Sequence, residues 1–154
     1  MNILADPAAC GPMQTSPQGR TRGRMAALGN KLSILVVDDH KNHRRLLTQM
    51  LARLGITSVH EASDGYSAVE LCANQVYDVI FMDISMPGMD GMEACARIRA
   101  LGGTCTTRII ACTAHVSEGA LAGFSRRGFD SVLTKPFLTG TLSETLSHCG
   151  AGCE

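Results

Sequence analysis

Several side chains that could act together in phosphate chemistry stand at the ends of apolar runs in this sequence. Two carboxylates, Asp38 and Asp39, follow the first run, Asp83 ends another, and Thr113 and Lys135 end two more. Converging carboxylates repel one another unless a hard cation neutralises them, and Mg²⁺ accepts a few carboxylates while keeping several waters. A carboxylate there can form an aspartyl phosphate, while the hydroxyl and the ammonium stabilise the charge on the transferred group. These residue types therefore predict a Mg²⁺-dependent phosphoryl-transfer site.

Asp83 is the carboxylate that we expect to react. It ends the apolar run 79–82, which is typical of a strand buried on both faces of a parallel sheet. The Pro-Gly pair at 87–88 and the Asp-Gly pair at 90–91 then force a loop. Because open α/β sheets bind their ligands beyond the carboxyl ends of their strands, Asp83 stands where a reactive group is expected.

Five strand-like segments alternate with segments of helical periodicity. Strands are predicted at residues 34–37, 57–61, 79–83, 108–113 and 132–135, the second being less apolar and nearer an edge. The helices are expected to bury the stripes Leu46, Leu47, Met50, Leu51 and Leu54; Tyr66, Val69, Ala73 and Val76; Met92, Cys95 and Ile98; and Leu138, Leu142, Leu146 and Cys149, with a weaker helix at 117–127. Such alternation implies right-handed crossovers, so the predicted fold class is α/β, a doubly wound five-stranded parallel sheet of the (βα)5 type.

The composition narrows the class of protein. The 154 residues suit one domain, and the 14 basic and 14 acidic residues cancel, so no overall field favours nucleic acid or a membrane. No apolar stretch reaches the roughly 18 residues of a membrane helix, and no secretion signal is evident. The acids at 38–39 also disfavour a nucleotide-binding loop, because they would repel its phosphates. Cys72, Cys95 and Cys112 are typical of small core residues, which favours a reduced, cytoplasmic setting.

Each candidate residue also has a purely structural interpretation. Asp39 could cap the following helix, Thr113 could serve strand propensity, and Lys135 could be a surface lysine. Taken together, these interpretations do not explain why compatible chemistry falls at four strand ends. His40 and His43 could be metal ligands, but exposed residues at a helix start are the favoured interpretation.

Five ordered motifs make the chain resemble the receiver domains of two-component response regulators, which share the flavodoxin-like fold of the chemotaxis receiver. The motifs are Ile34-Leu35-Val36-Val37-Asp38-Asp39, Glu61-Ala62-Ser63-Asp64-Gly65, Met82-Asp83-Ile84-Ser85-Met86-Pro87-Gly88-Met89-Asp90-Gly91, Ile110-Ala111-Cys112-Thr113-Ala114 and Leu133-Thr134-Lys135-Pro136-Phe137. The resemblance makes 31–149 the receiver domain, flanked by a disordered tail at 1–30 and a short tail at 150–154.

The resemblance implies a phosphoacceptor in two-component signalling or a phosphorelay. Asp83 would take a phosphoryl group from the phosphohistidine of a histidine kinase or a histidine phosphotransfer protein, and the domain would signal to a downstream protein. Mg²⁺ would be held by Asp39, Asp83 and the backbone carbonyl of Ser85, with Asp38 helping through water. Such a receiver promotes its own phosphorylation and dephosphorylation and is not an enzyme acting on other substrates.

The resemblance also assigns roles at the last two strands. Thr113 and Lys135 would contact the phosphoryl oxygens, and the Lys135-Pro136 bond would be cis. Three residues before the lysine, where the family usually carries a switch Tyr or Phe, this sequence has Val132. Two outputs remain, a shift of the loop and helix after Thr113 or a phosphoryl relay, which needs less conformational coupling.

Alternatives to a stand-alone receiver are open. A receiver module of a hybrid histidine kinase is the nearest, and the stand-alone form is slightly favoured because the chain begins and ends in short tails. An aspartate-nucleophile phosphatase of the haloacid dehalogenase class is less favoured, because it needs an acid two residues after the nucleophile and this chain has Ser85. An interaction module that has lost phosphorylation is disfavoured by the intact set of acids, hydroxyl and amine.

Overall fold

The computed structural model describes residues 32–104, 106–117 and 119–152, so the tail predicted at 1–30 lies outside the described residues. Its strands form one parallel five-stranded sheet in the order β2-β1-β3-β4-β5, as the α/β prediction requires. The elements are β1 (Ile34–Val37), α2 (Lys41–Arg53), β2 (Val59–Ala62), α3 (Gly65–Asn74), β3 (Val79–Asp83), α4 (Gly91–Ala100), β4 (Arg108–Thr113), α5 (Ala120–Arg126), β5 (Ser131–Thr134) and α6 (Thr139–Gly152).

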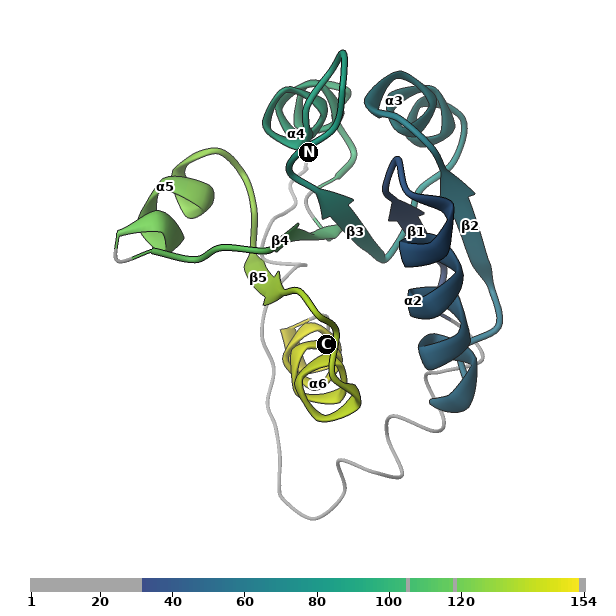
Figure 1. The fold of residues 1–154 in the computed structure, drawn as a ribbon. Coiled ribbons are helices and arrows are strands. Elements are labelled where there is room, and N and C mark those ends of the chain that lie inside the picture. The colour runs from purple at the N-terminus through teal and green to yellow at the C-terminus, as the bar shows by residue number, and fades with distance from the viewer. Residues whose placement is uncertain (1–31, 105, 118, 153–154) are drawn as a thin grey trace.

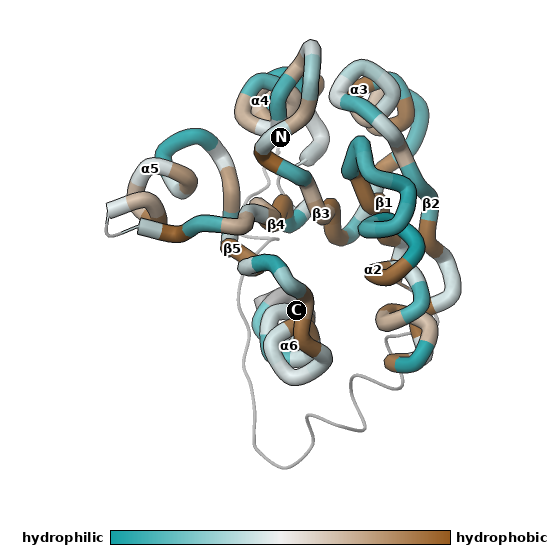
Figure 2. The backbone as a smooth tube through the Cα atoms, viewed as in Figure 1, coloured by the Kyte–Doolittle hydropathy of each residue, from teal (hydrophilic) through white to brown (hydrophobic). Residues whose placement is uncertain are grey.

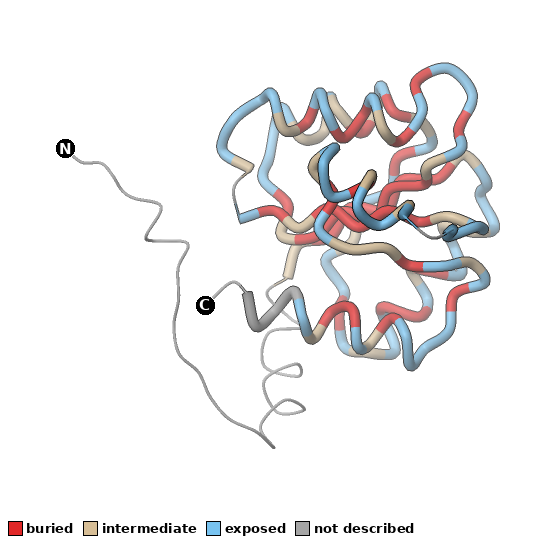
Figure 3. Tube along the Cα trace, turned by 90° about the vertical axis from the view of Figure 1, so that its left-hand side faces the viewer, coloured by how far each residue is buried: buried red, intermediate tan, exposed pale blue. Residues whose placement is uncertain are grey.

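Helices cover both faces of the sheet (Figure 1). The helices α3, α4 and α5 share one apolar cluster with Leu35 and Val37 of β1, whereas α2 and α6 share the other with Ile34 and Val36. Because successive strand side chains point to opposite faces, each strand serves both clusters. The strands β1, β3 and β4 are mostly apolar (Figure 2) and form the buried layer between the helices (Figure 3), whereas the edge strand β2 is partly polar and exposed.

The strand β3 lies at the centre of the sheet and carries Asp83 at its carboxyl end. It pairs with β1 so that Met82 lies opposite Val37, the last residue of β1. The residues that follow these two, Asp83 and Asp38, therefore lie side by side. It pairs with β4 so that Asp83 lies opposite Cys112. All five residues of β3 are buried, which is what an apolar central strand of a doubly wound sheet requires.

Three strands match their predicted ranges, and two are shifted at both ends, β2 to Val59–Ala62 and β5 to Ser131–Thr134. The edge strand β2 begins at Val59, because Thr57 and Ser58 are exposed and precede the residues that pair with β1. The strand β5 ends at Thr134, whose register partner is the last residue of β4, so Lys135 is the first residue beyond the strand and not its last.

The buried face of α3 differs from the predicted stripe. Two members of that stripe, Tyr66 and Val76, are 61% and 64% exposed. The buried positions include Gly65 and Ala68, since a Cβ on Gly65 would lie only 2.9 Å from the carbonyl oxygen of Met89. Small residues therefore let this helix approach the loop after β3, a feature that hydrophobic periodicity does not reveal.

Other helix predictions need smaller corrections. Leu46 and Leu138 are 44% and 62% exposed, and Leu138 precedes the first residue of α6. The helix α5 is shorter than the predicted 117–127 and begins after Gly119, whose φ of 87° is left-handed. At the other end, α6 continues three residues past 149 to Gly152, because helix ends depend on local backbone bonds that a sequence pattern locates only to within a few residues.

Candidate functional site

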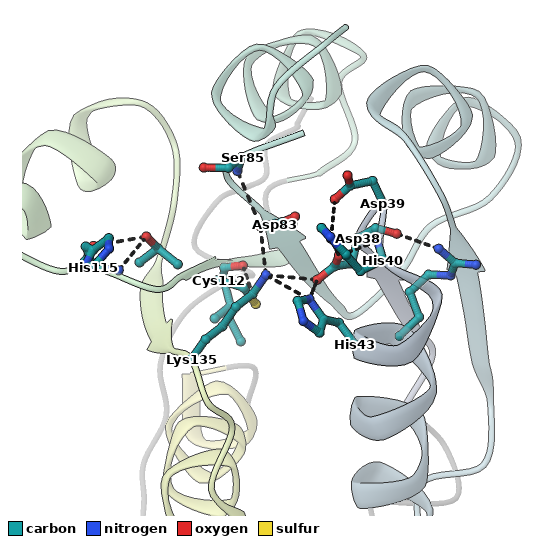
Figure 4. Close-up of polar contacts among 12 residues, drawn as sticks. Asp38, Asp39, His40, His43, Asp83, Ser85, Cys112, His115 and Lys135 are labelled. Carbon is teal, nitrogen blue, oxygen red and sulfur yellow. Dashed lines mark hydrogen bonds and ion pairs between the residues drawn. The ribbon is translucent and has the colours of Figure 1, made fainter. Parts of the chain in front are cut away.

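The carboxyl edge of the sheet brings three carboxylates together (Figure 4). Asp38 and Asp83 are almost completely buried, at 3% and 4% exposure, and the side chain of Asp39 is 24% exposed. One carboxylate oxygen from each of the three lies within 4.8 Å of the other two. The three acids predicted at the strand ends therefore form a cluster that could bind a metal ion.

Backbone contacts hold these acids in place. The Oδ1 of Asp38 accepts a hydrogen bond from the His40 amide at 2.8 Å, and Arg44 donates to the Asp38 carbonyl at 2.7 Å. The Oδ1 of Asp83 accepts from the amide of Ser85 at 3.4 Å. Gly91 packs so tightly behind Asp83 that a Cβ there would meet the Asp83 carbonyl oxygen, which fixes where the strand ends.

Lys135 provides the positive charge of the cluster. Its Nζ donates to Oδ2 of Asp38 and to Oδ1 of Asp83, both at 3.1 Å, and only 16% of its side chain is exposed. Its amide donates to the carbonyl of Thr113 at 2.8 Å, and the Lys135-Pro136 peptide bond is cis, as the family resemblance implied. The surface-lysine interpretation is therefore wrong.

The pKa values of Asp83 and Lys135 are both raised, for different reasons. Burial raises the pKa of the Asp83 carboxyl, and the charge of Asp38 adds to the shift, although the hydrogen bond from Lys135 opposes it. Burial alone would lower the pKa of Lys135, but its hydrogen bonds to Asp38 and Asp83 outweigh burial and raise it. One ammonium is therefore shared between two buried carboxylates.

Thr113 lies at the same edge, but its hydroxyl is engaged elsewhere. The Oγ1 donates to the carbonyl of His115 at 3.0 Å and accepts from the His115 amide at 3.2 Å. Within the described ranges, no hydrogen bond joins this hydroxyl to Asp83 or Lys135. The structure therefore places Thr113 next to the site without showing the contact that the family resemblance implies.

The remaining predicted residues are placed as follows. Ser85 lies two residues after Asp83 and is exposed. Its backbone carbonyl oxygen is the atom that we expect to bind the metal. Asp39 does not cap the next helix, because His40 is the N-cap residue and makes no side-chain capping bond. Val132 is partly buried against the cluster that contains Phe124 and Phe129, so an apolar residue fills the position of the usual aromatic switch.

His43 is a site residue that the sequence offered only as a less favoured metal ligand. Its Nδ1 lies 3.2 Å from Oδ2 of Asp38 and 3.4 Å from Nζ of Lys135, although 42% of its side chain is exposed. His40 and His43 do lie at the start of a helix with much of their side chains exposed, as expected. The available signal was the five-residue step from Asp38 to His43, which becomes informative once the strand end is known to turn directly into α2.

The donor set of this edge fits Mg²⁺. Three carboxylates converge, two of them are buried, and oxygen is the ligand atom that Mg²⁺ prefers. Burial and the charge of Asp38 raise the pKa of the Asp83 carboxyl, and a divalent cation bound there would oppose that shift by favouring the ionised form. The residues present therefore suit the metal that the chemistry requires.

Comparison with known proteins assigns the family. Residues 34–147 match the family model described as the response regulator receiver domain, and the chain belongs to that family. It is 35% identical over 127 residues to the sensor histidine kinase RcsC of Salmonella typhimurium. The aligned residues cover 82% of this chain and 13% of the kinase. It is 36% identical over 122 residues to the hybrid signal transduction histidine kinase G of Dictyostelium discoideum, covering 78% of this chain and 4% of that protein.

Solved structures give the same assignment. The chemotaxis protein CheY4 of Vibrio cholerae superposes with a TM-score of 0.72 at 30% identity, covering 77% of this chain and 98% of that one. The receiver domain of the sensor histidine kinase PA1611 of Pseudomonas aeruginosa, which has a magnesium ion coordinated in its active-site cleft, superposes with a TM-score of 0.70 at 33% identity, covering 77% and 97%. The fold is therefore that of a receiver domain of two-component signalling. Among the described residues, none of the helices combines the length and apolarity that crossing a bilayer would require.

Proposed function

We propose that Asp83 accepts a phosphoryl group from a phosphohistidine and carries it as an aspartyl phosphate that signals through protein contacts. The observation that supports this most strongly is the shared ammonium. Nζ of Lys135 lies 3.1 Å from both Asp38 and Asp83, and the three residues come from the ends of three different strands. This arrangement presents a buried carboxylate beside a fixed positive charge and two further acids. A nucleophile beside a fixed positive charge supports this proposal, because phosphoryl transfer depends mainly on positioning and on charge stabilisation.

In the proposed step, a carboxylate oxygen of Asp83 attacks phosphorus and forms an O–P bond while the N–P bond to the donor imidazole breaks. The electron pair of that bond leaves with the imidazole nitrogen. Lys135 donates a hydrogen bond to the attacking carboxylate, so its ammonium can also stabilise the negative charge on the phosphoryl oxygens. Thr113 would reach the same oxygens once its hydroxyl leaves the backbone of His115.

Mg²⁺ would be held by Asp39, Asp83 and the carbonyl of Ser85, with Asp38 assisting through water. When bound, the metal supplies charge neutralisation for a phosphoryl group that approaches three acids. The chain's own residues hold the carboxylates in place for the metal. Asp38 and Asp83 are buried, and the amides of His40 and Ser85 donate to their oxygens.

The same site would promote loss of the phosphoryl group to water, so the domain regulates its own phosphorylation without turning over other substrates. An aspartate-nucleophile phosphatase is a weaker proposal. The position two residues after Asp83 is Ser85, which cannot protonate a leaving group as a carboxylic acid would.

The proposed partners are a histidine kinase or a histidine phosphotransfer protein as donor and a downstream protein as receiver of the signal, in the cytoplasm and without direct nucleic acid contact. The chain spans only 13% and 4% of the two kinase relatives described above. Both a separate regulator and the receiver of a hybrid kinase therefore fit. The proposed domain limits remain residues 31–149.

A small phosphodonor tests the proposal without a cognate kinase. Acetyl phosphate and Mg²⁺ should phosphorylate the wild-type protein, omission of Mg²⁺ or addition of EDTA should prevent it, and Asp83→Asn should abolish it. Asp78→Asn is the matched control, because Asp78 immediately precedes the same strand and its Oδ2 accepts from the amide of Ser33, a role that an amide oxygen can keep. Equal phosphorylation of wild type and Asp83→Asn would refute the proposal.

A further inference from the structure

We propose that Asp38, His40 and His43 form a second cation site, selective for a borderline transition metal such as Zn²⁺, that shares Asp38 with the Mg²⁺ site and therefore competes with it. One ligand atom from each of these three residues lies within 4.8 Å of the other two. The competition rests on the proposed function, whereas the site itself does not. Nothing in the phosphoryl-transfer chemistry uses the two imidazoles.

The three residues are brought together by the turn from β1 into α2. Asp38 follows the strand, His40 is the N-cap residue of the helix, and His43 is three residues further on, which puts both rings on one side of the helix start. The ring centroids are 4.8 Å apart with an angle of 31° between the planes, so the two imidazoles lie side by side and not edge to face. Figure 4 shows both rings next to the Asp38 carboxylate.

The distances are close to those of a metal centre. The Nδ1 of His43 is 3.2 Å from one oxygen of Asp38, and the Nδ1 of His40 is 3.7 Å from the other. Two ligands bound to one tetrahedral Zn²⁺ lie about 3.4 Å apart, given metal–ligand bonds of about 2.1 Å. The Nδ1 of His40 also lies 3.2 Å from Oδ1 of Asp39, so metal binding would require this ring to turn away from Asp39, and its 66% exposed side chain has room to do so.

His43 already lies beside a positively charged group, the ammonium of Lys135. The Nδ1 of that ring lies 3.4 Å from Nζ of Lys135, which also bonds to the carboxylate of Asp38. When Nδ1 is unprotonated, it accepts from this ammonium, and a nitrogen lone pair and a carboxylate oxygen then face one positive charge. A transition metal ion bound by the same two atoms would carry twice that charge and would displace Lys135 from them.

Ligand type separates the two metals. The set of Asp38, Asp39 and Asp83 offers only oxygen, which suits Mg²⁺, whereas the set of Asp38, His40 and His43 offers two imidazole nitrogens, which suit Zn²⁺ and its neighbours. Three protein ligands leave a fourth position for water. A transition metal bound to Asp38 would take up the carboxylate that assists Mg²⁺ through water and would place a second divalent charge beside it, so we infer that the two ions compete.

The first test is metal binding by the full chain without any phosphodonor. Titration with Co²⁺ alone, followed by its visible absorption, should show a site in wild type that His40→Ala/His43→Ala weakens by at least about tenfold. His148→Ala is the matched control, since that ring contacts only the carbonyl of Glu144 on its own helix among the described residues. Comparison with this control also removes any contribution from cysteines. Equal Co²⁺ binding by the double variant and wild type would overturn the site.

The second test addresses the competition. Mg²⁺-dependent phosphorylation by acetyl phosphate is measured with rising Zn²⁺, and each protein is compared with its own zinc-free rate. Wild type and His148→Ala should lose phosphorylation, and the double histidine variant should need at least about tenfold more Zn²⁺ for the same loss. Asp38→Asn should weaken both Co²⁺ and Mg²⁺ binding.

The outcomes are distinguishable. If Co²⁺ binds through the histidines but Zn²⁺ leaves phosphorylation unchanged, the shared role of Asp38 is wrong. If wild type is not phosphorylated with Mg²⁺ alone, the proposed function fails, while the Co²⁺ titration still decides the second site.

Discussion

Nζ of Lys135 lies 3.1 Å from Oδ1 of Asp83, although 52 residues separate them in the sequence. The contact exists because β3 and β5 both point their carboxyl ends at one edge of the sheet, with β4 between them. Asp38 shares the same ammonium at 3.1 Å. One lysine therefore holds together two buried carboxylates that would otherwise repel each other.

Removing this ammonium should destabilise the metal-free protein more than the metal-bound one. In EDTA, Lys135→Ala should lower the free energy of unfolding by about 1–3 kcal/mol, because two buried carboxylates lose their charged partner. Mg²⁺ should narrow the difference from wild type, since the metal replaces the missing charge. Urea unfolding with and without Mg²⁺ measures this, and a difference that Mg²⁺ leaves unchanged would show that Lys135 acts only through packing.

The close approach behind Asp83 can be tested with two glycines. A Cβ on Gly91 would meet the carbonyl oxygen of Asp83 and lie 2.9 Å from Cα of Ile84, so Gly91→Ala must shift the end of β3. We expect it to destabilise the fold by about 1–3 kcal/mol and to reduce phosphorylation by acetyl phosphate. Gly123→Ala is the control, because a Cβ there meets nothing within 4 Å and α5 should gain about 0.5–1 kcal/mol. Full phosphorylation of Gly91→Ala would show that the approach does not position Asp83.

Thr113 should act through its hydroxyl and not through its methyl group. Thr113→Ala removes both bonds to the backbone of His115 and the hydroxyl that would reach the phosphoryl group. Phosphorylation by acetyl phosphate should fall on the order of tenfold or more, and Thr113→Ser should restore most of it. If alanine and serine variants behave alike, the hydroxyl has no part in the reaction.

The raised pKa of Asp83 predicts a pH dependence of stability. Because burial, aided by Asp38, raises the folded-state pKa above the usual value of 3.8, the folded protein binds this proton more tightly than the unfolded chain does. The Asp83 contribution is therefore lost as pH rises through the window that begins at the usual value and ends at the raised one. Above that window the ionised carboxylate costs stability.

The contribution of Asp83 to stability is obtained from the difference in unfolding free energy between wild type and Asp83→Asn. In EDTA, unfolding of wild type and Asp83→Asn is compared from about pH 4 to pH 7, a range chosen to start near the usual carboxyl pKa. The variant should gain stability relative to wild type as pH rises and then keep a constant advantage. A wild type that gains on the variant over this range would mean that Lys135 dominates and the pKa is lowered.

The sequence predicted the site's strands better than its helices, for a physical reason. The strands β1, β3 and β4 are apolar runs interrupted by a polar group at the point where the sheet ends, so composition marks their boundaries. The buried face of α3 was predicted only in part, because Val69 does pack against the core but the helix also packs through Gly65 and Ala68 and leaves Tyr66 exposed. A small residue carries no hydrophobic signal even where it permits the closest packing.

The site shows the same division. Asp38, Asp83 and Lys135 could be predicted to meet, because parallel strands share one carboxyl edge. The contact of His43 with the cluster could not, since it depends on the angle at which α2 leaves β1. The engagement of Thr113 with its own loop is equally local, and no spacing in the sequence indicates it.

The most direct test of the central claim is to locate the phosphoryl group. After treatment with acetyl phosphate and Mg²⁺, borohydride reduction converts an aspartyl phosphate to homoserine, which peptide mass spectrometry can assign to one residue. We predict homoserine at Asp83 and not at its neighbours Asp38 and Asp39, and none when Mg²⁺ is omitted. Homoserine at another aspartate, or none at Asp83 in a protein that has gained phosphate, would contradict the account.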